Sequence, residues 1–453
     1  MVDIGFIEKS LKTPSIKIGH PKNSIAEGFS IDSRDISPNQ CFIAVIGEIH
    51  NGHNYIRECN SKGVRFFIIQ NDYKNRIKKY IHNSFIIPVK DTLESLSILA
   101  KSYKKHIFAS SIGITGSSGK TTTRDLIARV LSAKYNVHAS SKNYNNNIGL
   151  PLTILQAPLQ THILVLEMGM NHKGELKKLS QIAEPLLGLI TNVGYAHIGM
   201  FGSLEKIAEA KSEIFSGINS HGIILLNRDD NFLEYFKKIS PVETMDFGIS
   251  DLSIIEDRGL EGYRLSYKNN YFEYHCPGSH NLSNLAAAIK VSEIYQVDEK
   301  ETVRLISDFK PLHGRSEIIP GNFTIIQDTY NANPSSMLKA LELLGKAKGR
   351  RIAVLSDMLE LGHLSHELHC MIGRHISKNK NADIVLAFGN NSRNIIENIK
   401  EKGIEKKFFQ NQEELSARLA ELVRSGDTVL VKASHEMKLE NTAAELLKIQ
   451  TAV

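Results

Sequence analysis

The segment 111-SIGITGSSGKTTTRDLIARVL-131 constrains the fold of this 453-residue chain more than any other. An apolar strand, IGIT, runs into a glycine-rich turn and then into a helix that begins at GKTTT. This order places several backbone N–H groups and a helix N-terminus around one point, which favours an anion such as phosphate. We therefore predict a strand, a phosphate-binding loop and a helix. The alternative, an ordinary tight turn with a surface lysine, accounts for less of the pattern.

The lysine and hydroxyl side chains of this loop are those that nucleotide chemistry uses. Lys120 is placed to reach the outer phosphates of the ligand, and the hydroxyl of Thr121 or Thr122 to bind Mg²⁺. The strict pattern GxxxxGK[ST] is not met, because Ile114 stands where the first glycine is required. We expect the bound phosphates to contact Gly116, Ser117, Ser118, Gly119, Lys120, Thr121 and Thr122.

Glu167 is the candidate for an acidic metal ligand near the loop. It lies in the apolar strand 162-HILVLEM-168, close to its end, where open α/β sheets bind ligands. A glutamate after a strand is often only solvated. Beside a phosphate loop, binding of Mg²⁺ is the favoured interpretation.

Three blocks of different periodicity divide the chain. Residues 1–85 contain short strands and turns, and a helical period begins at 91-DTLESLSILAKSYKKH-106. Residues 86–312 alternate continuous apolar strands with helices, which indicates a parallel sheet covered on both faces. Residues 313–453 restart this alternation with FTIIQ, RIAVLS, DIVLAFG, KKFFQ and DTVLVKAS. We predict an α/β protein of three domains with these boundaries.

Composition and charge narrow the classes of function. With 42% hydrophobic and 23% charged residues, the chain is typical of a soluble globular protein. No apolar run reaches the roughly 18 residues of a membrane span, and the N-terminus lacks a signal-peptide pattern. A net charge of +6 with dispersed lysines is weak support for nucleic-acid binding, so none is expected. Four cysteines without a CxxC pair predict buried free thiols and a cytoplasmic location.

A series of motifs occurs in a fixed order and resembles the Mur ligase family of cell-wall amino-acid ligases. The motifs are TGSSGKTT, NYNNNIGLPLTIL, EMGMNHKGEL, ITNVGYAHIGMFGS, EAKSEIF, GSHNLSNLAAAI, HGRSEI, DTYNANPSSM and SDMLELG. IDSRDISPNQCFIAVIGE and GHNYI in the first block add to the resemblance, which covers most of the chain. The departure from the strict phosphate-loop pattern is itself a feature of this family.

The resemblance implies a three-domain enzyme. A small α/β domain would bind the UDP-sugar, a central P-loop ATPase-like domain would bind ATP and Mg²⁺, and a C-terminal Rossmann-like domain would bind D-Ala-D-Ala. The reaction implied is ATP-dependent addition of D-Ala-D-Ala to UDP-MurNAc-tripeptide through an acyl phosphate, by a protein that we expect to be a monomer. Whether the third peptide residue is diaminopimelate or lysine stays open.

Roles in catalysis and metal binding follow from matching the motifs one by one. Lys120 would be the phosphate lysine, with Thr121 and Glu167 as Mg²⁺ ligands. His197, in YAHIGMFG, matches a histidine near a second metal. Lys211, in EAKSEIF, matches a lysine that is carbamylated in much of the family. An ion pair of Lys211 with Glu213 or Glu209 on an exposed helix face remains the alternative.

Substrate contacts are implied in the same way. Asn284 would bind adenine, Arg315 the ATP phosphates, and Asp328 the region of the ribose or the hinge. Ser33 and Arg34 match a turn near the uridine diphosphate, while Asn145 and Asn146 match a loop facing the muramoyl group. The candidates for D-Ala-D-Ala are Asn331, Asn333 and Asp357.

Two parts of the sequence depart from the usual pattern of the family. Ser356 and the segment ASHE after Lys432 differ from the usual residues of the family, which puts contacts to the dipeptide or nucleotide in doubt.

There are three alternative functions: a sister ligase for another amino acid, a nucleotide-dependent switch or motor, and a non-catalytic ATP-binding scaffold. DTYNANPSSM and SDMLELG argue against the first, and the missing NKxD motif argues against the second.

Overall fold

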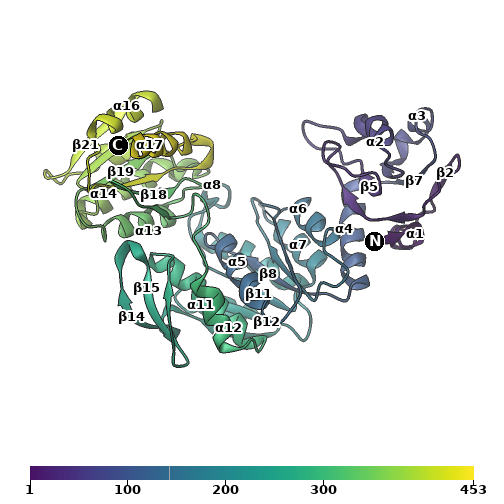
Figure 1. The fold of residues 1–453 in the computed structure, drawn as a ribbon, viewed down its shortest axis with the longest axis horizontal. Coiled ribbons are helices and arrows are strands. Elements are labelled where there is room, and N and C mark those ends of the chain that lie inside the picture. Colours follow the sequence, from purple (N-terminus) through teal and green to yellow (C-terminus); the bar gives the residue numbers. More distant parts are fainter. Residues whose placement is uncertain (142, 453) are drawn as a thin grey trace.

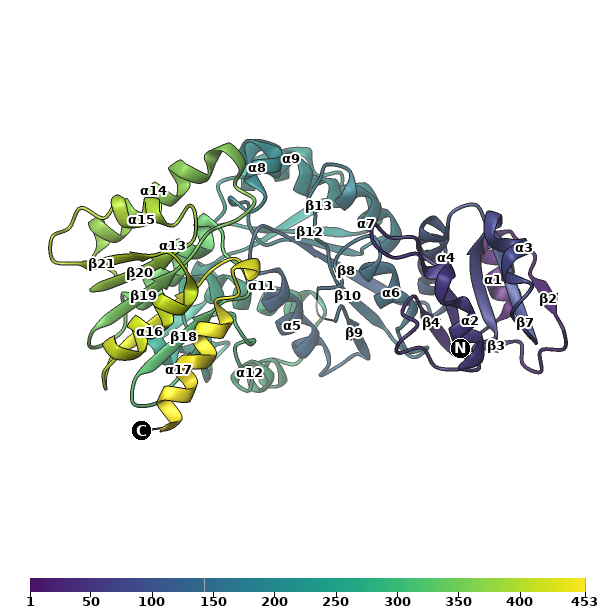
Figure 2. The same ribbon diagram turned by 90° about the horizontal axis from the view of Figure 1, so that it is seen from above.

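Three large β-sheets follow one another along the chain, each with helices beside it (Figure 1). The computed structural model describes residues 1–141 and 143–452. Seen from above in Figure 2, the N-terminal and C-terminal units lie at opposite ends of the central unit. The predicted α/β class is therefore confirmed.

The N-terminal unit is a five-stranded mixed sheet in the order β2-β7-β6-β5-β4. Only β2 runs antiparallel to its neighbour. The strands are β2 (Ile16–Ile18), β7 (Ser84–Val89), β6 (Phe66–Gln70), β5 (Gln40–Ile43) and β4 (Gly28–Ser30). A short ribbon of β1 (Val2–Asp3) and β3 (Ile25–Ala26) accompanies helices α1 (Ile4–Leu11), α2 (Ile56–Ser61) and α3 (Lys74–Ile77).

The predicted boundary after residue 85 is wrong by a few residues. It cuts β7, which pairs with β6 from Phe85 as far as Val89. The apolar run SFIIPV forms β7, and its pairing partner lies 19 residues earlier in the chain (Phe66 opposite Phe85), which the local sequence does not reveal. The second predicted boundary, after residue 312, falls between the last helix of the central unit and the first strand of the C-terminal unit.

The central unit is an all-parallel sheet in the order β13-β12-β11-β8-β10-β9. Its strands are β8 (Ser110–Thr115), β9 (Val137–Ala139), β10 (Ile163–Glu167), β11 (Leu187–Ile190), β12 (Ile223–Asn227) and β13 (Glu243–Phe247). β10 and β11 are buried along their whole length, which explains their continuous apolar sequence. Because the strands are parallel, all their carboxyl ends meet at one edge.

Helices cover the central sheet, and the two that begin at Thr92 and Lys120 do so where the sequence predicts. They are α4 (Thr92–His106), α5 (Lys120–Leu131), α6 (Gly149–Leu155), α7 (Glu175–Ala183), α8 (Ile198–Phe201), α9 (Leu204–Ser212), α10 (Leu233–Ile239), α11 (Ser279–Ile294) and α12 (Glu299–Ser307), with the 3₁₀ turns η3 (Glu213–Gly217) and η4 (Ile249–Asp251). Asp91 caps α4 as expected, because its carboxylate accepts hydrogen bonds from the N–H groups of Leu93 and Glu94.

A three-stranded antiparallel sheet in the central unit was not predicted. It consists of β14 (Ser253–Asp257), β15 (Tyr263–Tyr267) and β16 (Asn270–Tyr274). Every residue of β14 is exposed, so its sequence SIIED lacks the apolar periodicity of a buried strand.

The C-terminal unit is a six-stranded sheet in the order β17-β18-β22-β19-β20-β21, parallel except for β17. Its strands are β17 (Glu317–Ile319), β18 (Thr324–Asp328), β19 (Arg351–Leu355), β20 (Ile384–Phe388), β21 (Glu405–Phe409) and β22 (Thr428–Lys432). Its helices are α13 (Pro334–Leu344), α14 (Ser365–Asn379), α15 (Arg393–Glu397), α16 (Gln412–Leu422) and α17 (Glu440–Ala452), with the turns η6 (Gly362–Leu364) and η7 (His435–Met437). The five strands predicted from the sequence are all present.

Burial of apolar side chains holds these units together. Each fully buried leucine or isoleucine contributes about 1.5–3 kcal/mol to folding, and the strand interiors consist mostly of such residues. The four cysteines, Cys41, Cys59, Cys276 and Cys370, are buried and unpaired, as predicted. In the described part of the chain, no helix combines the length and the apolar character required to cross a membrane.

Candidate active site

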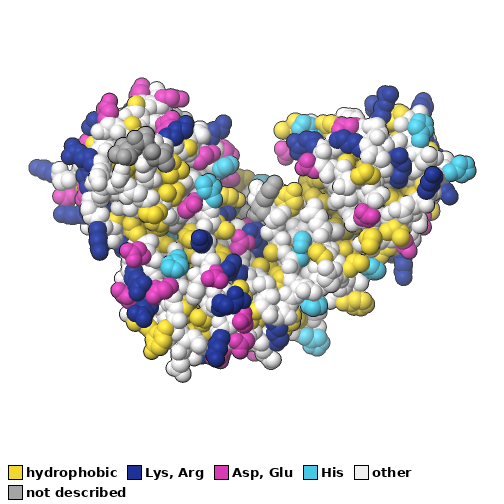
Figure 3. All heavy atoms as spheres, viewed as in Figure 1, with side chains coloured by type: hydrophobic (Ala, Val, Ile, Leu, Met, Phe, Trp, Pro, Cys, Tyr) yellow, Lys and Arg dark blue, Asp and Glu magenta, His cyan; other side chains and the backbone are white. Residues whose placement is uncertain are grey.

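A cavity of about 790 Å³ lies at the carboxyl edge of the central sheet and reaches the C-terminal unit. Figure 3 shows the surface hollowed between the first and third units, with the central unit as the floor. The predicted residues that line the cavity are Gly116, Ser117, Ser118, Gly119, Lys120, Thr121, Thr122, Asn145, Asn146, Glu167, His197, Lys211, Asn284, Arg315, Asp328, Asn331 and Asn333. Segments more than 200 residues apart in the sequence thus face one space.

The phosphate-binding loop requires its two glycines. Gly116 has φ +153°, and a Cβ there would lie 1.8 Å from the Thr191 hydroxyl oxygen. Gly119 has φ +77°, and a Cβ there would lie 2.4 Å from Oδ1 of Asn284. The end of β11 holds the loop in place, since the Thr191 hydroxyl donates to the Ser118 carbonyl at 2.6 Å. Any larger residue would displace the loop, so the cradle for an anion is built into the backbone.

Lys120 lies within this cradle. Its amine donates a hydrogen bond to the Gly116 carbonyl at 2.8 Å. Burial lowers the pKa of Lys120, the Glu167 carboxylate opposes this shift, and the Arg315 guanidinium adds to it. A bound polyphosphate would favour the charged form of the amine, so the site is suited to an anion.

Glu167 is buried at the end of β10 and accepts hydrogen bonds from two predicted neighbours. The Thr121 hydroxyl donates to Oε2 at 2.8 Å, and the Asn145 amide donates to Oε1 at 2.9 Å. Arg124 also lies 3.4 Å from Oε2. A hydroxyl and a carboxylate oxygen held together beside a phosphate loop suit the oxygen preference of Mg²⁺. Among the described residues, no three His, Cys, Asp or Glu side chains form a metal site by themselves.

His197 contacts the C-terminal unit as well as the cavity. It precedes α8 with φ +61°, and its Nδ1 lies 2.6 Å from Oε2 of Glu360. Interaction with His197 lowers the pKa of Glu360. The sequence motif identified His197, whereas Glu360 lies in SDMLELG and was not singled out.

Lys211 is buried on α9, beneath the cavity. Burial lowers the pKa of Lys211 well below its usual range, and the nearby Lys120 charge adds to this shift while Asp230 opposes it. Within residues 1–141 and 143–452, no hydrogen bond or ion pair involves the Lys211 amine. The predicted alternative, pairing with Glu209 or Glu213, is therefore wrong: Glu209 pairs with Lys173, and Glu213 accepts from the Gly174 N–H.

The start of α11 places two asparagines beside the phosphate loop. The Asn284 side chain accepts from the Thr123 hydroxyl at 3.1 Å and donates to Asn281 at 3.2 Å. Asn281 in turn donates to the Pro277 carbonyl at 2.8 Å. These contacts fix both amides at the wall of the cavity, where Asn284 was expected.

The edge of the C-terminal unit contributes charged groups. The guanidinium of Arg315 lies over the Tyr330 ring, 3.7 Å from its centroid. Asp328 accepts a hydrogen bond at 2.7 Å from the buried amine of Lys432, which also donates to the Asn331 carbonyl at 3.0 Å. Lys432 was not predicted as a site residue, although a lysine that ends the apolar strand DTVLVK is a usable signal.

The three predicted dipeptide residues occupy different environments. Asn331 and Asn333 line the cavity, and Asn333 also caps α13 by accepting from the Ser336 N–H at 2.9 Å. Asp357 is buried outside the cavity, where its carboxylate accepts from the Ser392 and Asn391 N–H groups at 2.7 and 3.0 Å. The prediction that Asp357 contacts the dipeptide is therefore corrected: its carboxylate caps the turn before α15.

Ser33 and Arg34 lie in the N-terminal unit and do not line this cavity. The Arg34 side chain is 84% exposed and pairs with Asp32 at 2.6 Å, which lowers the pKa of Asp32 to about 2. Ser33 is buried, and its carbonyl accepts from Lys62. A uridine diphosphate subsite at this turn stays a prediction.

A second cavity of about 710 Å³ adjoins the first and shares Thr121, Arg315, Tyr330 and Asn331 with it. The departing residues Ser434, His435 and Glu436 line this second space, together with Glu360. Both cavities lie where the central and C-terminal units meet.

The fold and site define a P-loop nucleotide-binding protein whose nucleotide cavity lies at the contact between two α/β units. Residues 114–292 match the family model of the Mur ligase middle domain, and residues 314–435 match that of the Mur ligase, glutamate ligase domain. The chain belongs to the Mur ligase family.

Individual relatives agree with this assignment. UDP-N-acetylmuramoyl-tripeptide–D-alanyl-D-alanine ligase of Bacillus subtilis is 35% identical over 94% of both chains. The enzyme of the same name from Treponema pallidum is 34% identical over 93% of this chain and 94% of its own. The crystal structure of MurF from Acinetobacter baumannii superposes with a TM-score of 0.89 at 26% identity and 98% coverage of both chains. MurF of Thermotoga maritima in complex with ADP superposes with a TM-score of 0.80 at 28% identity, over 94% of this chain and 98% of that one.

The contact between α8 and η6 predicts a sensitive glycine. The Gly199 N–H donates to the Glu360 carbonyl at 3.0 Å, and a Cβ on Gly199 would lie 2.4 Å from the Gly362 nitrogen. We expect Gly199→Ala to push the two units apart and to lower kcat about tenfold, equivalent to about 1.4 kcal/mol. Steady-state kinetics and a thermal melt check this.

Gly403→Ala is the matched control, because only the end of the Glu401 side chain, at 3.7 Å, lies near its Cβ position. Unchanged kcat in Gly199→Ala would contradict the importance of this contact.

Proposed function

We propose that this chain is an ATP-dependent carbon–nitrogen ligase that adds D-Ala-D-Ala to UDP-MurNAc-tripeptide in peptidoglycan precursor synthesis. The observation that carries the proposal is the convergence of Lys120, Glu167, His197 and Lys211 on one cavity. It occurs in a chain that aligns with enzymes of this name over about nine-tenths of its length.

The chemistry proceeds in two steps. An oxygen of the tripeptide's terminal carboxylate attacks the γ-phosphorus of ATP, and ADP leaves. The amine of D-Ala-D-Ala then attacks the carbonyl carbon of the acyl phosphate, loses a proton, and inorganic phosphate leaves. Positioning and neutralisation of charge are the main contributions expected from the protein.

The central unit would hold the reacting phosphates. Lys120 and the loop from Gly116 to Thr122 bind the polyphosphate, while Thr121 and Glu167 hold Mg²⁺, which supplies charge neutralisation. His197 lines the same cavity and would approach a second metal after breaking its contact with Glu360.

Lys211 would act as a carbamate. A lysine with a lowered pKa has a neutral amine that can attack carbon dioxide and release a proton to solvent, and the resulting carbamate would offer oxygen atoms to a metal. The burial of Lys211 and the absence of hydrogen bonds to its amine within the described residues support this role.

The remaining residues would bind the substrates. Asn284, Arg315 and Asp328 would bind the nucleotide, and Asn145 and Asn146 would face the muramoyl group. Asn331 and Asn333 would bind D-Ala-D-Ala, while Ser33 and Arg34 would bind the uridine diphosphate. We expect the enzyme to act in the cytoplasm, where ATP is available, and as a monomer.

The test is phosphate release from ATP, Mg²⁺ and UDP-MurNAc-tripeptide, measured with and without D-Ala-D-Ala. Release that depends on the dipeptide, with the pentapeptide product identified by mass, supports the proposal. Release only with diaminopimelate or lysine and the dipeptide-stage precursor would assign the chain to a sister reaction. Comparing tripeptides that end in diaminopimelate and in lysine identifies the natural substrate.

A further inference from the structure

Four consecutive residues that begin with the last residue of β12, Asn227 to Asp230, join the carboxyl ends of neighbouring strands. The Asn227 amide donates to the Thr191 carbonyl at the end of β11, at 2.8 Å. Asp229 accepts from the Ile249 N–H at 2.8 Å. Asp230 accepts from the Val193 N–H at 2.7 Å. This segment therefore connects three strand ends at the rim of the nucleotide cavity.

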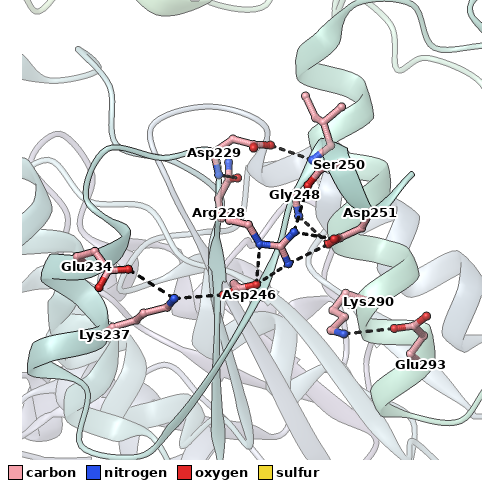
Figure 4. Close-up of polar contacts among 12 residues, drawn as sticks. Arg228, Asp229, Glu234, Lys237, Asp246, Gly248, Ser250, Asp251, Lys290 and Glu293 are labelled. Atoms are coloured by element: carbon pink, nitrogen blue, oxygen red, sulfur yellow. Dashed lines mark hydrogen bonds and ion pairs between the residues drawn. The ribbon is translucent and has the colours of Figure 1, made fainter. Parts of the chain in front are cut away.

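Arg228 makes the largest set of contacts in this segment (Figure 4). Its Nε donates to Asp246 at the end of β13 at 2.9 Å, and its Nη1 donates to Asp251 at 2.7 Å. Nη1 also donates to the Ser250 hydroxyl at 3.1 Å. The second oxygen of Asp251 accepts from the Gly248 N–H at 2.9 Å, so Arg228 closes the turn 248–251 from outside.

The turn 248–251 contributes to the wall of the cavity. Ile249 and Asp229 line it together with Ser283 and Asn284 of α11. The sheet order places β13 on the opposite side of the phosphate loop from β10, which ends at Glu167. If the reacting phosphate is directed toward Glu167, a bound nucleoside would extend toward β12, β13 and α11, where Ile249 would offer an apolar side chain to a flat base.

We propose that Arg228 is a positioning residue for ATP, which holds the turn 248–251 so that Ile249 forms the wall against the nucleoside. This inference rests on the proposed ATP-dependent function. Arg228 acts through the turn and does not itself line the described cavity.

Because Arg228 is partly exposed, we expect its main effect to be on the position of the turn 248–251 and its effect on folding stability to be small. Its side chain is 39% exposed, and ion pairs at such sites contribute only about 0–1 kcal/mol to folding. Replacing it should therefore leave the fold intact while loosening one wall of the cavity. A lysine cannot contact Asp246 and Asp251 with the same planar fork, so Arg228→Lys should be only partly effective.

Steady-state kinetics of Arg228→Ala test the proposal. We expect the KM for ATP to rise about tenfold, while kcat and the KM for UDP-MurNAc-tripeptide stay within about twofold. Arg258→Ala is the matched control: Arg258 is 31% exposed and pairs with Glu256 and Glu273 in the antiparallel sheet. It should behave like the unsubstituted protein.

A double-mutant cycle shows whether Arg228 acts through Ile249. Arg228→Ala with Ile249→Ala should raise the KM for ATP no more than Ile249→Ala alone, because both changes remove the same wall. Additive effects, or an unchanged KM for ATP in Arg228→Ala, would overturn the proposal. So would a parallel rise in the KM values of both substrates, since that indicates general loosening.

ATP affinity measured by calorimetry tests this inference independently of the proposed ligation. If the unsubstituted protein binds ATP but forms no pentapeptide, the proposed ligation fails, and ATP affinity in the two arginine variants still tests Arg228. If Arg228→Ala does not fold, Arg228→Lys provides the same comparison, with an expected rise in the dissociation constant of about threefold.

Discussion

Replacing Lys120 with alanine is expected to lower kcat for ligation about 10³-fold, equivalent to about 4 kcal/mol of transition-state stabilisation. The Lys120 amine already lies in the loop, 2.8 Å from the Gly116 carbonyl, and so needs little reorganisation to contact a phosphate. Burial and the nearby Arg315 guanidinium lower the pKa of Lys120, and the Glu167 carboxylate opposes this shift. Loss of this charge removes stabilisation as negative charge moves onto the leaving ADP.

Pentapeptide formation followed by mass spectrometry measures this effect. Lys178→Ala, an exposed lysine on α7, is the control and should keep full activity. Lys120→Arg should stay poorly active, because the larger guanidinium does not fit the loop as the amine does. Activity of Lys120→Ala close to that of the control would contradict the role of the loop in phosphoryl transfer.

Replacing Lys211 with alanine is expected to lower kcat about 10²-fold or more and to make activity responsive to added carboxylates. The substitution removes the buried amine and leaves room in the cavity wall for a small anion. Formate or acetate can then supply oxygens where the carbamate would stand. Partial recovery of activity with millimolar acetate would support the carbamate directly.

Two controls make the Lys211 result specific. Lys206→Ala removes an exposed lysine from the same helix and should neither lose activity nor respond to acetate. The unsubstituted protein should lose activity in buffer depleted of carbon dioxide and regain it with bicarbonate. Full activity of Lys211→Ala without acetate would exclude a metal-binding carbamate at this position.

Local sequence patterns predicted the strands of the parallel sheets well. β10, β11, β20 and β22 are buried on both faces, so their continuous apolar sequences carry the signal. β14 was not predicted, because all five of its residues are exposed. The first domain boundary was misplaced because β7 is held by a pairing partner elsewhere in the chain.

The site residues likewise fall into two groups: those that local spacing predicted, and those whose partners lie far away in the chain. Spacing within TGSSGKTT located Gly116 and Gly119, and both glycines have positive φ values in the structure. Lys432 and Glu360 were missed because their partners, Asp328 and His197, lie 104 and 163 residues away. Asp357 was misplaced because an aspartate after a strand can point into a cavity or cap a neighbouring turn, and the sequence around it is the same in both cases.

By itself, the sequence determined the α/β class, the phosphate-binding loop and the order of motifs that resembles the Mur ligase family. These features depend on residues close together in the chain, where periodicity and glycine spacing restrict the backbone directly. Only the tertiary structure decided that Lys211 is buried without a hydrogen-bond partner among the described residues, that His197 faces Glu360, and that Arg228 holds the turn bearing Ile249. Burial and such contacts arise when the sheets assemble and their strand ends converge, and neighbouring residues in the chain do not encode that convergence.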